Sequence, residues 1–596
     1  MPKSLVSRLP PGLPLILQAL SINALPVAVV ITASRFLYIH NNVKIPTTLV
    51  VLAALVSIPA VYAARIIYRS WSIKRRAARM GAVLPPVWKG KSFGSLDVLK
   101  YGLELVRKGY PGDGFWDRID EFGGLHSMNV LWDLVHITTD AHILKTVLAT
   151  DFQSFEKGDM FRDTMNSVLG VGVFNADGEL WKFHRSMTRP YFSRDRISHF
   201  EMFDRHADLA LKKMKERFRG GHAIDFQDLI SRFTMDSATE FLFGSCVHSL
   251  KSDLPYAYND PLALGIVRSQ SAADRFSAAF AAAQEVIAMR SRIGWTWRLK
   301  ELWTDASKEH MKVVDEYLQP ILEDAIRKNR NSTGKGQAEA DENETLLDHL
   351  VKYTDDFNVL HDETLNIMIA GRDTTAATLT FAIYLLCLYP EVFKRLRAEI
   401  LEKIGPTQMP NFDDIRTMKY LRAVINETLR LYPIVPFNIR VATRDTTIPN
   451  PDPTKPPIFV PAKVGVAYSV FLMHRRKDYW GPDALYFDPD RFLDERLNKY
   501  FTGNPFIFLP FNAGPRICLG QQFAYNEMSF FLIRLLQNFS HMELDLNAQP
   551  PDARPPPEWA GAEGQRGAEK IVPRMHLTLY VHGGLWVKMT EAERTA

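Results

Sequence analysis

The stretch FNAGPRICLG, residues 511–520, decides the fold of this chain more than any other segment. It places Cys518 in a glycine-containing loop just before residues 522–538, an apolar segment with helical periodicity. The unpaired N–H groups and the macrodipole at a helix N-terminus stabilise a thiolate, and Arg516 adds positive charge nearby. A thiolate in this position can attack an electrophile or ligate a metal ion.

Three cysteines in the whole chain narrow the choice of chemistry. No second cysteine lies close enough to Cys518 for a C-x-x-C pair, which argues against zinc and redox-pair sites. Ligation of haem iron is favoured, because a thiolate ligand pushes electron density onto iron and favours O–O cleavage. The alternative is a buried structural cysteine, the usual role of a lone cysteine, and this is our interpretation of Cys246 and Cys387.

The loop around Cys518 resembles F-x-x-G-x-R-x-C-x-G, the haem-binding signature of the cytochrome P450 monooxygenases. The matching residues are Phe511, Gly514, Arg516, Cys518 and Gly520. The resemblance implies haem b with the Cys518 thiolate as axial ligand. Both glycines permit tight turns that aim backbone N–H groups at the sulfur. Arg516 can reach a haem propionate, and Phe511 can shield the sulfur from water.

A second pattern lies in IMIAGRDTTAATLTF, residues 367–381, within a long apolar helical segment. Gly371 lowers local helix stability by roughly 1 kcal/mol. Thr374 can bond back to the carbonyl of Ala370 and bend the helix, which leaves a polar notch for O2. The segment resembles the family's A-G-x-D-T-T oxygen-activation motif. That implies Asp373 in the proton relay and Thr374 as the alcohol that stabilises activated oxygen.

Glu427 and Arg430, in NETLRLYP, share one helical face at positions i and i+3. Other Glu-x-x-Arg pairs occur in the chain, but this one lies between the oxygen-activation segment and FDPDRF. It resembles the family's E-x-x-R motif, which with Arg491 forms a structural ion cluster behind the haem. Asp490 stands where the family more often has glutamate, and we expect no functional change from it.

Trp181 and Arg185, in DGELWKFHR, lie at i and i+4 and resemble the family's W-x-x-x-R motif. An indole N–H and a guanidinium on one helical face can both donate to one haem propionate. Arg440, in PFNIRVA, is a further candidate partner of a propionate. These three residues and Arg516 form the predicted cofactor-binding set.

Two uncharged segments near the N-terminus, residues 13–34 and 45–64, are each long enough to span a bilayer. Basic residues flank the pair on both outer sides. The positive-inside rule therefore predicts a hairpin anchor with both flanks in the cytoplasm. The first segment could instead lie in the membrane interface. Residues 1–80 are thus a predicted anchor, residues 81–92, with Pro85 and Pro86, a stiff hinge, and residues 93–596 the catalytic domain.

Composition bounds the fold of the remaining chain. With 596 residues, 46% of them hydrophobic and 23% charged, most of the protein should fold around a core. The net charge of +5 does not indicate a nucleic-acid partner. Helical periodicity occurs at 207–217, 311–327, 362–388, 390–404, 421–431 and 522–538, and two short strands around a Gly583-Gly584 turn are expected at 576–589. We predict a mainly α fold with minor β, the cytochrome P450 fold.

The resemblance also implies the reaction. One oxygen atom from O2 enters a hydrophobic substrate, and Asp373 and Thr374 favour this over the peroxide isomerisations of some haem-thiolate relatives. No flavin or nicotinamide domain is recognisable, so electrons should come from a separate NADPH–cytochrome P450 reductase, with cytochrome b5 as a further candidate donor. We expect the protein in the endoplasmic reticulum membrane, among its lipids, with the catalytic domain facing the cytosol.

The chain resembles fungal alkane and fatty-acid hydroxylases in its double anchor and in three sequence segments, AGRDTT, SFEKG and DGELWKFHR. An apolar pocket suits an alkyl chain that partitions from the membrane. The candidate lining residues are Phe161, Met165, Leu169, Phe174, Ala370, Val435 and Phe437. Oxidation of aromatic xenobiotics or alkylphenols is the alternative. There are two non-enzymatic alternatives: a membrane-tethered haem sensor, and a structural membrane protein without a cofactor.

Overall fold

The structure is a computed structural model that describes residues 10–192, 200–264, 271–332 and 344–593. It confirms the prediction of a mainly helical fold with minor sheet. Every helix expected from periodicity is present, usually a few residues longer than its pattern. They are α9 (Glu201–Arg219), α13 (Lys308–Ser332), α15 (Phe357–Leu388), α16 (Pro390–Lys403), α18 (Lys419–Leu431) and α22 (Gln521–Asn538).

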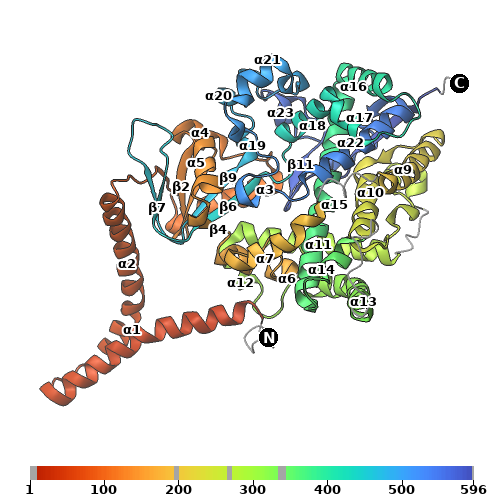
Figure 1. Cartoon of the computed structure of the whole chain (residues 1–596). Coiled ribbons are helices and arrows are strands. Elements are labelled where there is room, and N and C mark those ends of the chain that lie inside the picture. Colours follow the sequence, from red (N-terminus) through yellow and green to blue (C-terminus); the bar gives the residue numbers. More distant parts are fainter. Residues whose placement is uncertain (1–9, 193–199, 265–270, 333–343, 594–596) are drawn as a thin grey trace.

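Helix α15 runs through the centre of the fold, between α10 (Phe226–Phe243), α18 and α22 (Figure 1). The Asp356 carboxylate caps its start by accepting hydrogen bonds from the next turn's backbone N–H groups. Its second half is apolar all round and is buried from Thr375 to Leu386. A helix that is apolar on every side is stable only inside a core, and this burial fixes the position of the polar AGRDTT segment.

A six-stranded sheet lies beside the helices, in the order β1-β2-β3-β9-β6-β4 (Figure 1). Its strands are β1 (Val87–Trp88), β2 (Leu125–Val130), β3 (Asp133–Thr138), β4 (Phe155–Glu156), β6 (Phe437–Ala442) and β9 (Gly465–Ser469). β4 and β6 are antiparallel, with Glu156 opposite Val441. This pairing brings Lys157, which follows β4, close to Arg440 on β6.

The two strands expected around Gly583 and Gly584 exist, but they do not form a hairpin. β12 (Leu579–Val581) pairs with β11 (Pro573–Met575), whereas β13 (Trp586–Glu591) pairs with β10 (Phe539–Leu544) and β5 (Ile224–Asp225). Both glycines have positive φ angles, 75° and 83°, and the chain turns there from one sheet to the other.

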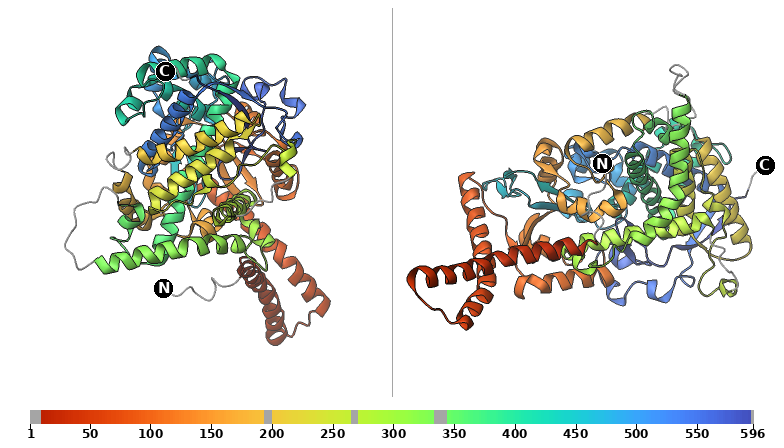
Figure 2. Two further views of the ribbon diagram at one scale, coloured as in Figure 1. Left: turned by 90° about the vertical axis from the view of Figure 1, so that its right-hand side faces the viewer. Right: turned by 90° about the horizontal axis from the view of Figure 1, so that it is seen from below.

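Helices α1 (Gly12–Asn41) and α2 (Thr47–Arg79) project from the rest of the chain in all three views (Figures 1 and 2). Each contains an apolar window that is long enough to cross a membrane and is not buried against the protein. The bent pair of α15 and α16 also reaches that length, but α15 is buried in the core. α1 extends the first expected span at both ends, and α2 begins two residues into the second and extends well beyond its end. Both helices are therefore available as a membrane anchor.

Residues 81–92, expected to form a hinge, are bonded to the globular part. Val83 exchanges two backbone hydrogen bonds with the segment around Phe459, and β1 adds to the sheet beside β2. At the end of α2, Arg76 donates two hydrogen bonds to Asp445, at 2.6 and 2.9 Å. The base of α2 is thus fixed against the sheet.

Candidate functional site

The loop before α22 is folded tightly around Cys518. The Cys518 N–H donates to the Phe511 carbonyl at 3.0 Å, and the Ile517 N–H donates to the Gly514 carbonyl at 3.0 Å. Gly514 has a φ of 69°, and a Cβ there would lie 1.8 Å from the carbonyl oxygen of Leu148. Only glycine fits such an approach. Gly520, by contrast, has a φ of −85°, which any residue adopts.

Cys518 faces a cavity of about 470 Å³. Its lining comes from Trp181, Arg185, Arg189 and Phe192, and from Gly514, Pro515, Ile517, Cys518 and Leu519 of the Cys518 loop. The sulfur is accessible within this cavity, yet protein surrounds it, and this desolvation raises the pKa of the thiol. The backbone N–H of Gly520 and the Arg185 guanidinium oppose that shift. The cavity therefore holds a thiol together with the donors that stabilise its anion.

Positively charged side chains gather beside this cavity. Arg516 donates to Asp177 at 2.6 Å and is almost fully buried. Arg440, also buried, donates to the Ile439 carbonyl and to Asn438. Burial and the nearby Arg440 charge lower the pKa of Arg516 to about 10, although Asp177 opposes the shift. Among the described residues, Nε of both arginines lacks a hydrogen-bond partner.

Lys157 is a third cation in this cluster, and sequence reasoning missed it. Its Nζ donates to Asn438 at 3.2 Å. Burial, with the charges of Arg440 and Arg516, lowers its pKa well below the ordinary value. We call Lys157, Arg440 and Arg516 the cation cluster. Among the described residues, Arg516 is the one member of the cluster that forms an ion pair with a carboxylate, so the cluster suits an anionic group.

Helix α7 (Gly178–Thr188) supplies Trp181 and Arg185 to the same cavity. The Arg516 guanidinium lies 4.6 Å from the centre of the Trp181 ring, and that of Arg185 lies 5.9 Å from it. His184 of the same helix lies 3.0 Å from an oxygen of Glu363 on α15, and both side chains are fully buried. This buried pair ties the helix that lines the cavity to the central helix.

The polar segment of α15 has the local geometry that its sequence indicates. The Thr374 hydroxyl donates to the Ala370 carbonyl at 2.6 Å, which confirms the expected back-bond. Asp373 pairs with its neighbour Arg372, with Nε and Oδ1 3.5 Å apart. Its other oxygen is buried and has no hydrogen-bond partner among the described residues. A Cβ on Gly371 would meet only Ala238, at 3.8 Å, so the helix has room on this side.

Glu427, Arg430 and Arg491 come together in a fully buried cluster, which we call the Glu427 cluster. Arg430 donates to both Glu427 oxygens at 2.7 Å, and Arg491 lies 3.4 Å from one of them. The remaining guanidinium N–H groups donate to backbone carbonyls or to Asp483. Hydrogen bonds to these carbonyls fix the irregular segment 474–491 against α18.

The candidate pocket residues are scattered in their burial. Met165 and Leu169, on α6 (Asp159–Leu169), are buried in the core with α11 (Ala272–Ile293) and α13. Phe174 and Val435 are exposed, and Phe437 packs against Phe115 with ring centres 5.9 Å apart. Phe161 lies beneath Lys157, whose Nζ is 4.3 Å from the ring centre. Ala370, on α15, accepts the Thr374 bond.

Glu527 of α22 is a second residue that sequence reasoning missed. It is fully buried, and burial raises its pKa to about 8, although the nearby hydroxyls of Thr375 and Ser237 lower it in part. Thr375 directly follows Thr374. A glutamate in a helical sequence gives no signal of burial by itself, so only the packing of α22 on α15 reveals it.

Comparisons with known proteins agree with this site. Residues 95–560 match the family model of cytochrome P450. The chain is 38% identical over 470 residues to cytochrome P450 52A3-A of Candida maltosa, covering 77% of this chain and 85% of the relative. It is 38% identical over 413 residues to cytochrome P450 52E1 of Candida apicola, covering 68% and 76%. The chain belongs to the cytochrome P450 family.

Members of this family are monooxygenases that hold haem b through a cysteine thiolate. The residues of this P450 fit that group. The cavity beside Cys518 offers a thiolate ligand. The cation cluster offers the Nε–H donors of Arg440 and Arg516, which have no hydrogen-bond partner among the described residues. Relatives also include cytochrome P450 52-M1 of Starmerella bombicola, 38% identical over 418 residues, 68% of this chain and 75% of the relative.

Proposed function

We propose that Cys518 is the thiolate ligand of haem b and that the cation cluster, with Trp181 and Arg185, holds the propionates. The observation that carries this is the cavity where Cys518, Trp181 and Arg185 meet beside the buried cations. Bound haem supplies activation of O2 with electrons from a redox partner. The Gly520 N–H and Arg185 stabilise the sulfur anion, and the Gly514 turn holds the loop in place.

The residues of α15 supply the protons in this proposal. The Asp373 carboxylate, with one buried oxygen unbonded among the described residues, can receive and pass a proton. Arg372 holds the other oxygen. The Thr374 hydroxyl already donates to the Ala370 carbonyl, so its lone pairs remain free to accept a hydrogen bond. The Glu427 cluster keeps the fold rigid on the other side of the site.

The proposed reaction is terminal or near-terminal hydroxylation of medium- to long-chain alkanes or fatty acids. Three observations support this proposal: the sequences of the segments AGRDTT, SFEKG and DGELWKFHR, the apolar character of the candidate pocket residues, and the similarity to the P450 52 relatives. We further propose that α1 and α2 anchor the protein in the endoplasmic reticulum membrane with the catalytic part in the cytosol. Electrons would come from NADPH–cytochrome P450 reductase, and cytochrome b5 is a further candidate.

The absorbance difference spectrum of the reduced protein with and without carbon monoxide tests the ligand. We expect a strongly red-shifted Soret band in the wild type and its loss in Cys518→Ser. A Cys387→Ser variant is the matched control and should keep the band. Haem-free wild-type protein, or a spectrum unchanged by Cys518→Ser, would overturn the assignment.

Product analysis with reductase and NADPH tests the substrate. Hydroxylated alkanes or fatty acids should form with tight coupling to NADPH use. Alkyl turnover at background, together with efficient oxidation of polycyclic aromatics, would favour the xenobiotic alternative. Thr374→Ala should keep its haem spectrum and release reducing equivalents as peroxide. A haem sensor would show no NADPH turnover to uncouple.

A further inference from the structure

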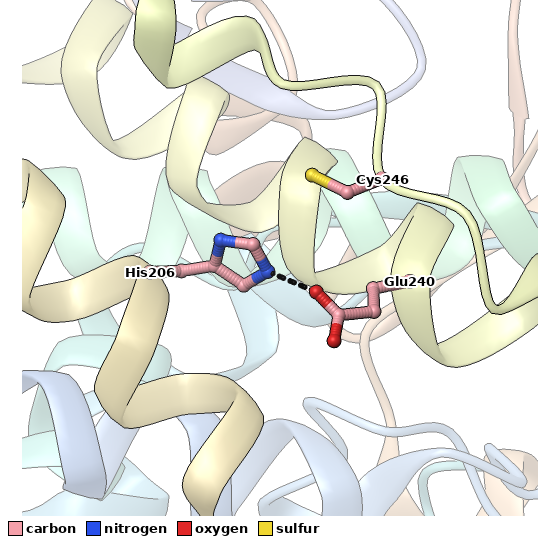
Figure 3. A group of neighbouring side chains, drawn as sticks. All are labelled: His206, Glu240 and Cys246. Carbon is pink, nitrogen blue, oxygen red and sulfur yellow. Dashed lines mark hydrogen bonds and ion pairs between the residues drawn. The ribbon is translucent and has the colours of Figure 1, made fainter.

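A second cysteine, Cys246, lies in a cluster of metal-ligand side chains that the P450 chemistry does not use. His206 comes from α9, Glu240 from the last turn of α10, and Cys246 from the loop that follows it (Figure 3). One ligand atom from each, nitrogen, oxygen and sulfur, lies within 4.8 Å of the others. We propose that these three side chains form a binding site for Zn²⁺ or a similar borderline-soft divalent cation.

The ligand set selects the class of metal. Thiolate, imidazole and carboxylate together suit zinc, whereas Mg²⁺ and Ca²⁺ prefer oxygen ligands alone. Around a tetrahedral zinc with bonds of about 2.0–2.3 Å, neighbouring ligand atoms are roughly 3.3–3.8 Å apart. A pair of ligand atoms at the upper limit of 4.8 Å would therefore approach by about 1 Å on binding. Three protein ligands leave the fourth position to water.

The partners around the three ligands already resemble a second coordination shell. Arg205, which is not a ligand, donates to one Glu240 oxygen. The other Glu240 oxygen lies 2.8 Å from His206 Nε2, a contact between two of the ligands that must open when the metal binds. The backbone N–H of His248 donates to the Cys246 sulfur at 3.2 Å. Such outer partners orient carboxylate and thiolate ligands toward a metal.

The loop that carries Cys246 is also anchored close to the site. The Val247 N–H donates to the Thr239 hydroxyl, and the Ser249 and Leu250 N–H groups donate to Asp236. Thr239 and Asp236 belong to α10, like Glu240. The loop is therefore folded back on the helix that supplies the second ligand, which reduces the ordering cost of binding.

Charge balance favours a cation at this site. Zn²⁺ binds a deprotonated thiolate, a carboxylate and a neutral imidazole, so the Cys246 thiol proton leaves when the metal binds. The resulting neutral imidazole, carboxylate and thiolate carry two negative charges, which one divalent cation neutralises.

The site is linked to the Cys518 cavity by a short chain of rings. Phe241, next to Glu240, lies 4.5 Å from the Phe523 ring of α22 and 5.9 Å from the Phe192 ring. Phe192 lines the cavity. A bound metal would cross-link α9, α10 and the Cys246 loop close to the Phe192 side of the cavity. We therefore expect it to raise the midpoint of thermal unfolding of the holoenzyme.

The test uses the full-length, haem-loaded protein without an affinity tag, incubated with Zn²⁺ and then freed of unbound metal. Elemental analysis should find one zinc per haem, and X-ray absorption at the zinc edge should show a single sulfur neighbour. Cys246→Ser and His206→Gln should each weaken zinc affinity by at least about tenfold, because loss of a mere outer-shell partner already costs that much.

Cys387→Ser is the matched control and should bind zinc as the wild type does. The carbon monoxide spectrum of each variant shows whether the haem domain is intact, so a folding failure is separated from loss of the metal site. No retained zinc in the wild type, equal retention in Cys246→Ser, or a shell without sulfur would each overturn the proposal.

Discussion

The Glu427 cluster and the cation cluster both bury arginines, but they differ in how far the arginine charges are compensated by partners within the protein. In the Glu427 cluster, Arg430 has a bidentate carboxylate partner and three backbone carbonyls. In the cation cluster, Arg440 donates to one carbonyl and one amide, and its Nε has no partner among the described residues. A saturated network fixes the fold, whereas an unsaturated one is suited to a ligand of opposite charge.

The largest expected effect comes from breaking the saturated network. Arg430→Met leaves the buried Glu427 carboxylate without its main partner, which costs about 3–5 kcal/mol of stability. That is a large fraction of the roughly 5–15 kcal/mol typical of a folded domain. Urea unfolding of the holoenzyme and the yield of folded protein measure it. An unchanged unfolding midpoint would show that the cluster is dispensable.

Glu527 is a buried acid, and its contribution to the stability of the fold depends on pH. Its pKa rises from 4.5 to about 8 on folding, so the folded state binds the extra proton between these values. Its contribution to stability is full below pH 4.5 and is lost as pH rises through about 8. Over the two pH units from 6 to 8, the loss is on the order of 3 kcal/mol.

Glu527→Gln should remove this part of the pH dependence. Thermal midpoints of wild type and variant, measured from pH 6 to pH 9, provide the comparison. We expect the variant to gain on the wild type as pH rises. Parallel curves would mean that Glu527 stays ionised in the fold.

Lys157→Met tests the unsaturated cluster and should act with the opposite sign in the two states of the protein. Without haem, the loss of an uncompensated charge should leave stability unchanged or raised. With haem, the loss of a charge-assisted hydrogen bond of about 1.5–3 kcal/mol should weaken retention by roughly ten- to a hundredfold. Transfer of haem to apomyoglobin measures this. Lys182→Met, an exposed lysine on α7, is the control.

Equal haem retention in Lys157→Met and Lys182→Met would contradict the assignment of Lys157 to a propionate. Lys157→Arg provides the complementary check, because it restores the charge and should recover most of the retention. A variant that loses haem and stability together would place Lys157 with the Glu427 cluster instead.

The smallest effect is expected at the rim of the Glu427 cluster. Arg395 and Asp490 form an ion pair of 2.7 Å, but about half of each side chain is exposed. Asp490→Asn should cost less than about 0.5 kcal/mol, because solvent and salt screen exposed pairs. Urea unfolding at low and high salt measures it. A loss comparable to that of Arg430→Met would show that burial does not set the strength of these pairs.

Sequence and structure diverge where partners are distant in the chain. Cys518, Asp373, Thr374 and Glu427 were found because each belongs to a short motif whose residues lie within one loop or a few helical turns. Lys157 was not predicted as a site residue, because its partners on β6 and in the Cys518 loop follow it by about 280 residues or more. The pattern at 576–589 predicted both strands correctly but placed them in one hairpin.

The sequence by itself determined the helical character of the chain, the two apolar N-terminal segments, the family and its haem-thiolate chemistry, because these depend on local periodicity and short motifs. The tertiary structure alone decided which buried charges are compensated by a partner within the protein and which are not. It brought Lys157 to Arg440, buried Glu527 beneath Thr375, and placed Cys246 beside His206 and Glu240. The physical reason is that burial and charge pairing arise from packing between distant segments, which no local pattern encodes.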